Sequence, residues 1–320
     1  MPIKTAAGLA ANTGLRREGI CTIDEVRART QDIRPLKLLI LNLMPMKERT
    51  ELQLLRLLGN TPLQIEVDFA HTATHAAAHA DPDYLERNYL TFADVKDRLY
   101  DALIITGAPV ETLAFGEVDY WPEFQHYIAW AKTHAYATLT LCWAAQAALF
   151  ERYGIEKRPL AGKLSGIYEY PRTLRHHALL RGFDDRYRIP QSRHTESDAE
   201  GIRREAELEI VSESFQHGIN LVCSKNHRDT YVFGHFEYDR GTLAWEYERD
   251  LKAGKIPDVP ENYFPGDNSG ERPEFTWKSS ANLFFRNWIN LLYEETPFDL
   301  RELLSAPNPG IPSETVEDPE

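Results

Sequence analysis

Apolar residues in the first half of the chain form short, nearly continuous runs that alternate with longer amphipathic stretches. The first run, residues 36–43, is apolar at all but two positions and has the length of a strand covered on both faces. The stretch Lys47–Leu58 has leucines at helical spacing and is followed directly by a glycine, which predicts a helix. We expect its buried face to be formed by leucines, namely Leu54, Leu55 and Leu58, widened by Leu52 and Leu57.

The same alternation continues to about residue 150. Further strands are predicted at residues 63–69, 102–105 and 137–141, and further helices at residues 121–132 and 143–150. Strands that alternate with helices form parallel sheets, because each helix returns the chain to the same edge of the sheet. The sequence therefore predicts an α/β fold with a central, mostly parallel sheet and helices on both faces.

The second half predicts shorter strands and two more helices. The strands are expected at residues 208–212, 220–224 and 230–233, and the helices at residues 242–252 and 279–293.

Three regions follow from this pattern. Residues 1–34 carry little periodicity and form an N-terminal extension, and residues 35–300 form a single α/β domain. Residues 301–320 form a C-terminal tail that is rich in proline and glutamate, and we predict that it is disordered.

Charge and composition exclude several classes of protein. The net charge of −13 argues against partners such as nucleic acid and anionic membranes. No apolar stretch has transmembrane length, and residues 1–12 lack a secretory h-region, so a cytoplasmic location is predicted. The cysteines Cys21, Cys142 and Cys223 form no CxxC pair, which predicts neither a disulfide framework nor a zinc site.

Three histidines at a spacing of four raise the question of a metal. A helix would place His71, His75 and His79 on one face, but the segment follows a strand directly and begins with weak helix formers. We therefore predict no metal and interpret residues 71–83 as a solvated loop or short helix.

Cys142 stands where a predicted strand ends and a predicted helix begins. A thiol at the amino end of a helix is stabilised as thiolate, which is the nucleophilic form. In a parallel sheet the carboxyl ends of the strands meet at one edge, so residues 42–47, 107–111 and Cys142 should converge there. The alternative is a buried core cysteine without a chemical role.

His235 and Glu237 supply a candidate base and the group that orients it. Two residues apart in an extended chain, their side chains share a face and can point into the same cleft. The alternative is that His235 caps a strand and Glu237 is solvated.

Several segments together resemble the homoserine O-acyltransferase family, the homoserine O-succinyl- and O-acetyltransferases related to class I glutamine amidotransferases. The resemblance covers roughly residues 30 to 300, in order. It implies the three-layer, flavodoxin-like form of the α/β fold. The segments that carry it are residues 106–109, 141–147, 163–169 and 234–239, with residues 41–45 and 262–265.

The resemblance also implies a mechanism and a substrate site. In that family the residue matching Cys142 takes an acyl group from acyl-CoA, the one matching His235 is the general base and the one matching Glu237 orients it. No cofactor stays bound, acetyl-CoA acts as co-substrate with L-homoserine, and the protein is a homodimer. Further matching residues contact substrate or lie near the nucleophile: Lys163, Ser192 and Arg249, and Lys47.

Local chemistry adds detail to these roles. The backbone amide of Trp143, at the start of a helix, is a candidate donor to the tetrahedral oxyanion, and the Leu43–Met44 turn could supply a second donor, which the sequence alone does not show. Arg249 offers a planar fork for an amino-acid carboxylate, although a surface ion pair with Glu246 or Asp250 is the alternative.

Phe236 departs from the family pattern, which has proline between the histidine and the glutamate. Proline would fix the backbone angle φ, whereas phenylalanine leaves the backbone freer. The sequence therefore leaves the orientation of Glu237 open.

Glu111 is expected to select the acyl group. In the family that it resembles, glutamate at this position accompanies acetyl transfer and glycine accompanies succinyl transfer. A glutamate would repel the terminal carboxylate of succinyl-CoA, by about 4 kcal/mol at about 4 Å and an effective dielectric constant of about 20. The predicted activity is acetylation of homoserine for methionine biosynthesis. The alternatives are succinyl transfer, serine O-acetylation, a glutamine amidotransferase-like hydrolase and a non-catalytic binding protein.

Overall fold

A central eight-stranded sheet organises the protein. Its strands are β3 (Leu36–Leu41), β4 (Ile65–Ala70), β5 (Tyr89–Leu90), β6 (Tyr100–Ile105), β7 (Ala135–Leu141), β10 (Leu208–Ser214), β11 (Gly218–Ser224) and β12 (Asp229–Val232). The computed structural model describes residues 3–4, 22–23, 34–74, 81–174 and 176–305.

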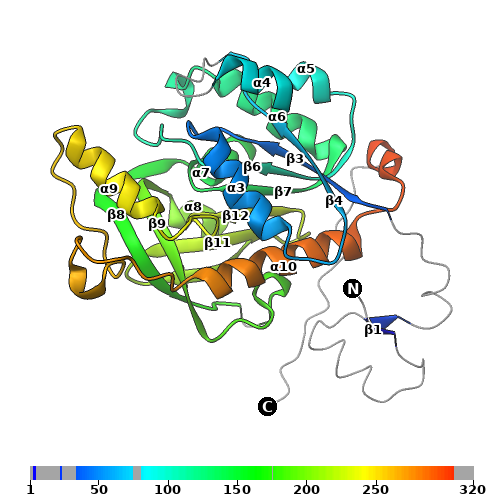
Figure 1. Cartoon of the computed structure of the whole chain (residues 1–320). Coiled ribbons are helices and arrows are strands. Elements are labelled where there is room, and N and C mark those ends of the chain that lie inside the picture. The colour runs from blue at the N-terminus through cyan, green and yellow to red at the C-terminus, as the bar shows by residue number, and fades with distance from the viewer. Residues whose placement is uncertain (1–2, 5–21, 24–33, 75–80, 175, 306–320) are drawn as a thin grey trace.

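The strand order is β10-β11-β12-β7-β6-β3-β4-β5. The six strands from β12 to β5 pair in parallel, and β10 and β11 extend the sheet in antiparallel pairing at one edge. Figure 1 shows the sheet between layers of helices. The predicted α/β class with a mostly parallel sheet is confirmed.

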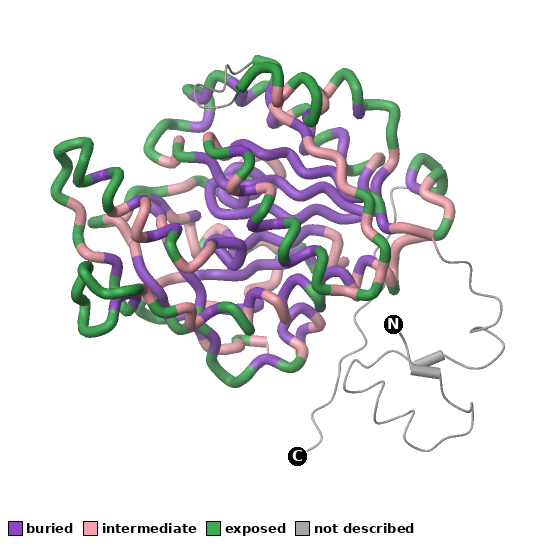
Figure 2. The backbone as a smooth tube through the Cα atoms, viewed as in Figure 1, coloured by how far each residue is buried: buried purple, intermediate pink, exposed green. Residues whose placement is uncertain are grey.

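Helices cover both faces of the sheet because the parallel strands are apolar on both sides. In β3, Leu38 and Ile40 pack towards α3 (Lys47–Leu58) and α10 (Lys278–Glu295). Leu39 and Leu41, which point to the other face, pack with the buried side chains of α6 (Trp121–His134) and α7 (Trp143–Tyr153). The tube in Figure 2 is correspondingly buried along the central strands.

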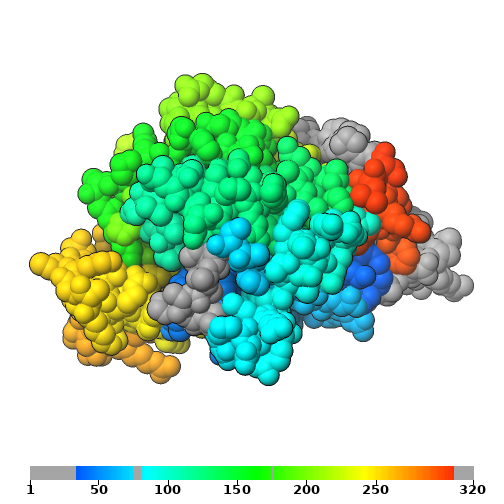
Figure 3. Space-filling view, turned by 90° about the horizontal axis from the view of Figure 1, so that it is seen from above, coloured from blue at the N-terminus to red at the C-terminus, as the bar shows by residue number. Residues whose placement is uncertain are grey.

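The described residues also form further α-helices and several 3₁₀ turns. The α-helices are α4 (Pro82–Asn88), α5 (Phe92–Val95), α8 (Ala199–Arg204) and α9 (Thr242–Lys252). The 3₁₀ turns are η1 (Phe115–Glu117), η2 (Ala178–Leu180), η3 (Pro265–Asp267) and η4 (Leu300–Leu304). Figure 3 shows α9 in yellow and η4 in red at opposite ends of the molecule.

A long hairpin of β8 (Lys157–Pro171) and β9 (Arg186–Ser197) was not predicted. Its alternation is hidden because β9 buries polar side chains on its inner face. Gln191, Arg193 and Thr195 are buried at positions where the pattern of an ordinary strand would have apolar residues. The first half of β8 is also largely exposed, so it carries no apolar period.

The helix α3 has the predicted bounds but a different buried face. Leu54, Leu57 and Leu58 are buried, whereas Leu52 and Leu55 are 57% and 41% exposed. The prediction for these two leucines is wrong because the buried stripe runs through polar residues instead, Thr50 and Gln53. Gln53 is accommodated there because its amide Nε2 donates to the Thr242 hydroxyl at 2.9 Å.

Near the two termini, the structure describes only some of the predicted regions. Two-residue strands β1 (Ile3–Lys4) and β2 (Thr22–Ile23) pair in parallel within the predicted extension. Packed structure extends past residue 300, since Leu303 of η4 is buried, so the predicted domain boundary is a few residues too early. The predicted disordered tail from residue 306 on, together with Cys21, His75 and His79, lies outside the described residues. None of the described helices combines the length and apolar character needed to cross a membrane.

Candidate active site

Three neighbouring strands of the sheet end at one place. Cys142 follows β7, Gly107 lies two residues after β6, and His235 and Glu237 follow β12, which pairs with β7. A methyl group added at Gly107 would lie 3.3 Å from Cβ of Cys142 and 3.5 Å from Cε1 of His235. The carboxyl edge of the sheet therefore brings the predicted nucleophile and the predicted base together.

Cys142 occupies a strained backbone elbow. Its φ of 51° and ψ of −115° lie outside the regions that side-chain-bearing residues prefer, a strain of about 1–3 kcal/mol. The elbow is held because the Cys142 amide donates to the carbonyl oxygen of Val232 at 2.7 Å. The thiol is buried, and it stands at the N-cap of α7, where the helix dipole favours a negatively charged sulfur.

The first residue of α7 is Trp143, so its backbone N–H belongs to the first turn, whose donors have no acceptor within the helix. This position suits the predicted oxyanion donor. The second donor predicted in the Leu43–Met44 turn is not supported. The amide of Leu43 donates to the Thr106 hydroxyl at 2.8 Å, and that of Met44 donates to Oδ1 of Asn42 at 3.2 Å.

His235 and Glu237 form a buried, hydrogen-bonded pair. Nδ1 of His235 lies 2.7 Å from Oε1 of Glu237. Nε2 of His235 and Oε2 of Glu237 are buried without a hydrogen-bond partner among the described residues. Burial opposes a positive charge on His235, but the negative charges of Cys142 and Glu237 outweigh it and raise the pKa of His235 well above its usual range. The site therefore favours the imidazolium form of His235.

Phe236, the departure from the family pattern, is fixed by packing. Its ring stacks on Phe284 with a centroid distance of 4.6 Å and on Tyr187 at 5.9 Å. The segment is also tied to β9, because the His235 amide donates to the Pro190 carbonyl at 2.9 Å. A Cβ at Gly234 would come within 2.8 Å of atoms of β9, so this close approach requires glycine. Tertiary contacts thus restrict the backbone where proline is missing.

Two of the predicted substrate residues meet at one buried carboxylate of α9. Oε2 of Glu246 accepts a hydrogen bond from the Ser192 hydroxyl at 2.5 Å and lies 3.7 Å from Nζ of Lys163. Lys163 also lies 3.8 Å from Asp250, one helical turn further along α9. We refer to Lys163, Ser192, Glu246 and Asp250 as the Glu246 cluster.

Tyr238 connects this cluster to the pair of His235 and Glu237. Its hydroxyl donates to Oε1 of Glu246 at 2.7 Å, and its ring stacks on the imidazole of His235 at a centroid distance of 4.0 Å. The sequence analysis did not single out Tyr238, and it considered Glu246 only as an ion-pair partner of Arg249. The available signal was the i, i+4 spacing of two acids, Glu246 and Asp250, on the inward face of an amphipathic helix.

Arg249 forms the ion pair that was predicted as the alternative to binding a substrate carboxylate. The guanidinium is 44% exposed and pairs with the carboxylate of Asp250, with Nη2 at 3.0 Å from Oδ1. Its Cζ also lies 5.3 Å from the ring centroid of Trp245. The side chain stands beside the Glu246 cluster through Asp250, so a small rotation would be needed to release its fork for a substrate carboxylate.

Lys47 is the first residue of α3 and lies at the carboxyl end of β3. Its ammonium group donates to the carbonyl oxygen of Asn42 and is buried. Burial lowers the pKa of Lys47 to about 8, against the opposing charge of Glu51. The structure therefore places this lysine at the same edge of the sheet as Cys142, two strands away in the order β7-β6-β3.

Glu111 lies in the loop after β6 and is half-buried. Nζ of Lys157 donates to the main-chain oxygens of Glu111 and Leu113, both at 2.6 Å, and lies 4.5 Å from the ring centroid of Phe115. Burial lowers the pKa of Lys157, while the charges of Glu111 and Glu117 oppose that effect. The lysine thus holds the loop that carries the predicted specificity residue.

Comparisons with known proteins identify the family. The model of the family described as homoserine O-succinyltransferase matches residues 2–298. A relative from Streptococcus thermophilus, named homoserine O-acetyltransferase, is 50% identical over 304 residues and aligns with 95% of this chain and 97% of its own. A relative of the same name from Streptococcus pneumoniae is 52% identical with the same coverage.

Solved structures support the fold. A glutamine amidotransferase from Thermotoga maritima superposes with a TM-score of 0.51 at 14% identity, covering 82% of this chain and 100% of that one. This likeness agrees with the predicted class I glutamine amidotransferase-like architecture. Since the family model spans most of the chain and relatives are about half identical, the chain belongs to the homoserine O-acyltransferase family and is an enzyme that transfers an acyl group to homoserine.

Proposed function

We propose that this enzyme is a homoserine O-acetyltransferase that carries the acetyl group on Cys142 and follows a ping-pong mechanism. The observation that supports the covalent route is the strained, buried Cys142 beside the hydrogen-bonded pair of His235 and Glu237. The acetyl group is supported by the names of the two relatives that are half identical.

In the first half-reaction the sulfur of Cys142 attacks the carbonyl carbon of acetyl-CoA. The bond between that carbon and the sulfur of CoA breaks, and the CoA thiolate takes the proton from the His235 imidazolium. The raised pKa of His235 favours this starting ion pair, and the Trp143 amide is positioned to donate to the oxyanion. The products are free CoA, a neutral His235 and an acetyl thioester on Cys142.

In the second half-reaction His235 takes the proton from the hydroxyl of homoserine. The hydroxyl oxygen attacks the acetyl carbon, and the bond to the sulfur of Cys142 breaks. The ion pair of Cys142 and His235 is restored, and Glu237 holds the imidazole through Nδ1, so that Nε2 faces the reacting atoms. A thioester suits the first half-reaction because acyl transfer between two thiols is nearly balanced in energy.

The acceptor is expected to bind towards α9. Lys163, Ser192 and Arg249, which the family resemblance assigns to substrate, lie in or beside the Glu246 cluster, and Tyr238 links that cluster to His235. Homoserine carries one ammonium and one carboxylate, and the residues in and beside the Glu246 cluster include both acidic and basic side chains. A role in methionine biosynthesis, a cytoplasmic location and a homodimer stay predictions made from the sequence.

A matrix of substrates tests the proposal. Purified enzyme is assayed with acetyl-CoA and succinyl-CoA against homoserine, serine and glutamine, and intact protein is weighed after reaction with each donor alone. We expect acetyl-CoA and homoserine to give the highest kcat/KM, and an added acetyl mass that is absent in Cys142→Ala. Higher kcat/KM with succinyl-CoA or with serine would support one of the alternative transferases, and ammonia release from glutamine without CoA would support the hydrolase.

The role of Glu111 is tested separately. Glu111→Gly removes the carboxylate that is expected to repel succinyl-CoA, so succinyl transfer should rise by two to three decades, as roughly 4 kcal/mol of repulsion implies. Glu117→Gly, which removes a second carboxylate near Lys157, is the matched control and should leave donor preference unchanged. No gain of succinyl transfer in Glu111→Gly would contradict the charge argument.

A further inference from the structure

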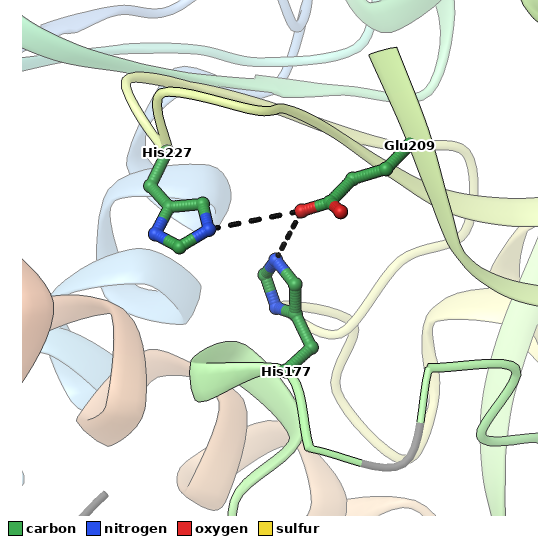
Figure 4. Close-up of side chains that lie close together, drawn as sticks. All are labelled: His177, Glu209 and His227. Carbon is green, nitrogen blue, oxygen red and sulfur yellow. Dashed lines mark ion pairs between the residues drawn. The ribbon is translucent and has the colours of Figure 1, made fainter. Parts of the chain in front are cut away.

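Two histidines and a glutamate converge away from the catalytic residues. Oε1 of Glu209 lies 3.2 Å from Nε2 of His177 and 3.7 Å from Nε2 of His227, and the three ligand atoms all lie within 4.8 Å of one another. Figure 4 shows both imidazole rings directed towards the same carboxylate oxygen. No residue of this group takes part in the proposed acyl transfer.

The three residues come from separate elements and lie at the opposite end of the sheet from Cys142. His177 caps η2, Glu209 is the second residue of β10, and His227 lies in the turn between β11 and β12. That turn enters the amino end of β12, whereas His235 and Glu237 follow its carboxyl end. The site is therefore independent of the catalytic residues.

The spacing of the three groups suits a bound cation. His177 is 8% exposed, and its Nε2 lies 3.2 Å from Oε1 of Glu209. Ligands about 2.0–2.2 Å from a tetrahedral ion lie roughly 3.3–3.5 Å from each other, close to the two separations seen here.

We propose that His177, Glu209 and His227 bind a zinc ion through Nε2, Oε1 and Nε2, with water completing the coordination. Two imidazole nitrogens and one carboxylate oxygen form a donor set that zinc accepts. The ion ties η2 to β10 and to the β11–β12 turn, so its role is structural.

One existing contact must change when zinc binds. Nδ1 of His177 accepts the Leu179 amide at 3.2 Å, so this nitrogen holds a lone pair in the structure. Coordination at Nε2 moves the ring proton to Nδ1, which ends that hydrogen bond. Zinc should therefore accelerate hydrogen exchange at the Leu179 amide while slowing exchange in the β11–β12 turn.

Calorimetry of the full-length, chelator-treated enzyme with zinc chloride tests the site. We expect one zinc ion per chain in wild type and in Cys142→Ala, which lacks the nucleophilic thiol. Glu209→Gln and His227→Asn should each weaken binding by at least about 100-fold, and both side chains are exposed enough for the variants to fold. His194→Asn, at an exposed histidine of β9, is the matched control and should bind like wild type.

Two further measurements complete the test. Cobalt chloride should give the visible absorption bands of a bound ion in wild type and not in Glu209→Gln. Zinc should raise the Tm of wild type and of His194→Asn, and leave the Tm of His227→Asn unchanged. The proposal is overturned if wild type binds no zinc at micromolar concentration, if Glu209→Gln binds as tightly as wild type, or if Cys142→Ala alone loses the ion.

Discussion

Two groups of buried polar residues at opposite ends of the sheet, around Asp101 and around Cys142, differ in how far their hydrogen bonds are satisfied. At the amino end Asp101 of β6 is fully buried and accepts three hydrogen bonds, two from Arg34 at 2.7 and 2.8 Å and one from the Lys37 amide at 2.7 Å. Arg34 also donates to the main-chain oxygens of Pro297 and Phe298, which fastens the C-terminal segment.

At the carboxyl end the polar groups are left incomplete. Nε2 of His235 and Oε2 of Glu237 have no hydrogen-bond partner in the part of the chain that the structure describes, and the backbone of Cys142 is strained. Unpaired buried groups and strain both cost stability, and both leave atoms ready for a substrate. The Asp101 network therefore stabilises the fold, whereas the groups around Cys142 are available for a substrate.

Removing the nucleophile should have the largest effect and should separate activity from stability. Cys142→Ala is expected to lower kcat for acetyl transfer by at least about 10³-fold, because no thioester can form, while the free energy of unfolding changes little. Steady-state kinetics and urea unfolding measure the two quantities. A residual kcat above a tenth of wild type would contradict the covalent route.

Removing Asp101, the buried acid at the amino end of the sheet, should lower stability and leave activity unchanged. Asp101→Ala leaves the Arg34 charge without its partner and should reduce the free energy of unfolding by about 3–5 kcal/mol. Activity per folded molecule should be unchanged, because this residue lies at the far end of β6. Asp97→Ala, an exposed acid just before β6, is the control and should lie within about 0.5 kcal/mol of wild type.

The buried Lys47 should make the stability of the protein increase with pH. The lysine binds a proton up to about pH 8 in the folded state and up to about pH 10.4 when unfolded, so stability rises with pH across that window. The folded pKa of about 8 implies a rise of about 3 kcal/mol between pH 7.5 and 10.5.

This rise should be absent in Lys47→Met. The measurement is the difference in the free energy of unfolding between wild type and Lys47→Met, taken at pH 7.5 and at pH 10.5. Tyrosines titrate equally in the two proteins, so their contribution cancels in this difference. Lys252→Met, at a lysine 80% exposed, is the control and should follow wild type. A pH-independent difference for Lys47→Met would contradict the lowered pKa.

The smallest effect concerns the elbow itself. Glycine adopts positive φ freely, whereas alanine keeps the strain at φ 51°. Cys142→Gly should therefore be more stable than Cys142→Ala by about 1 kcal/mol, although both are inactive. Equal stability of the two variants in urea unfolding would show that the elbow stores no strain.

Sequence reasoning succeeded where a signal is local. The run of residues 137–141 followed by helix formers predicted the elbow at Cys142, and the bounds of α3 and α9 were predicted correctly. It failed where the pairing partners are distant. The hairpin of β8 and β9 was missed because its inner face carries polar residues whose partners lie elsewhere in the fold, as with Gln191 and Asn220.

Phe236 is a second case in which the sequence left open what distant contacts decided. The sequence identified the missing proline but left the orientation of Glu237 open. The stacking of Phe236 on Tyr187 and Phe284 decided it, and these rings come from residues about 50 positions away on either side.

By itself the sequence determined the alternation of strands and helices, the candidate nucleophile and base, and the resemblance that names the family. These follow from periodicity and from residues that are close in the chain. Only the tertiary structure decided how Glu246 gathers Lys163, Ser192 and Tyr238, and how Glu209 meets two histidines. The physical reason is that contacts between distant segments depend on the pairing order of the strands, which no local pattern encodes.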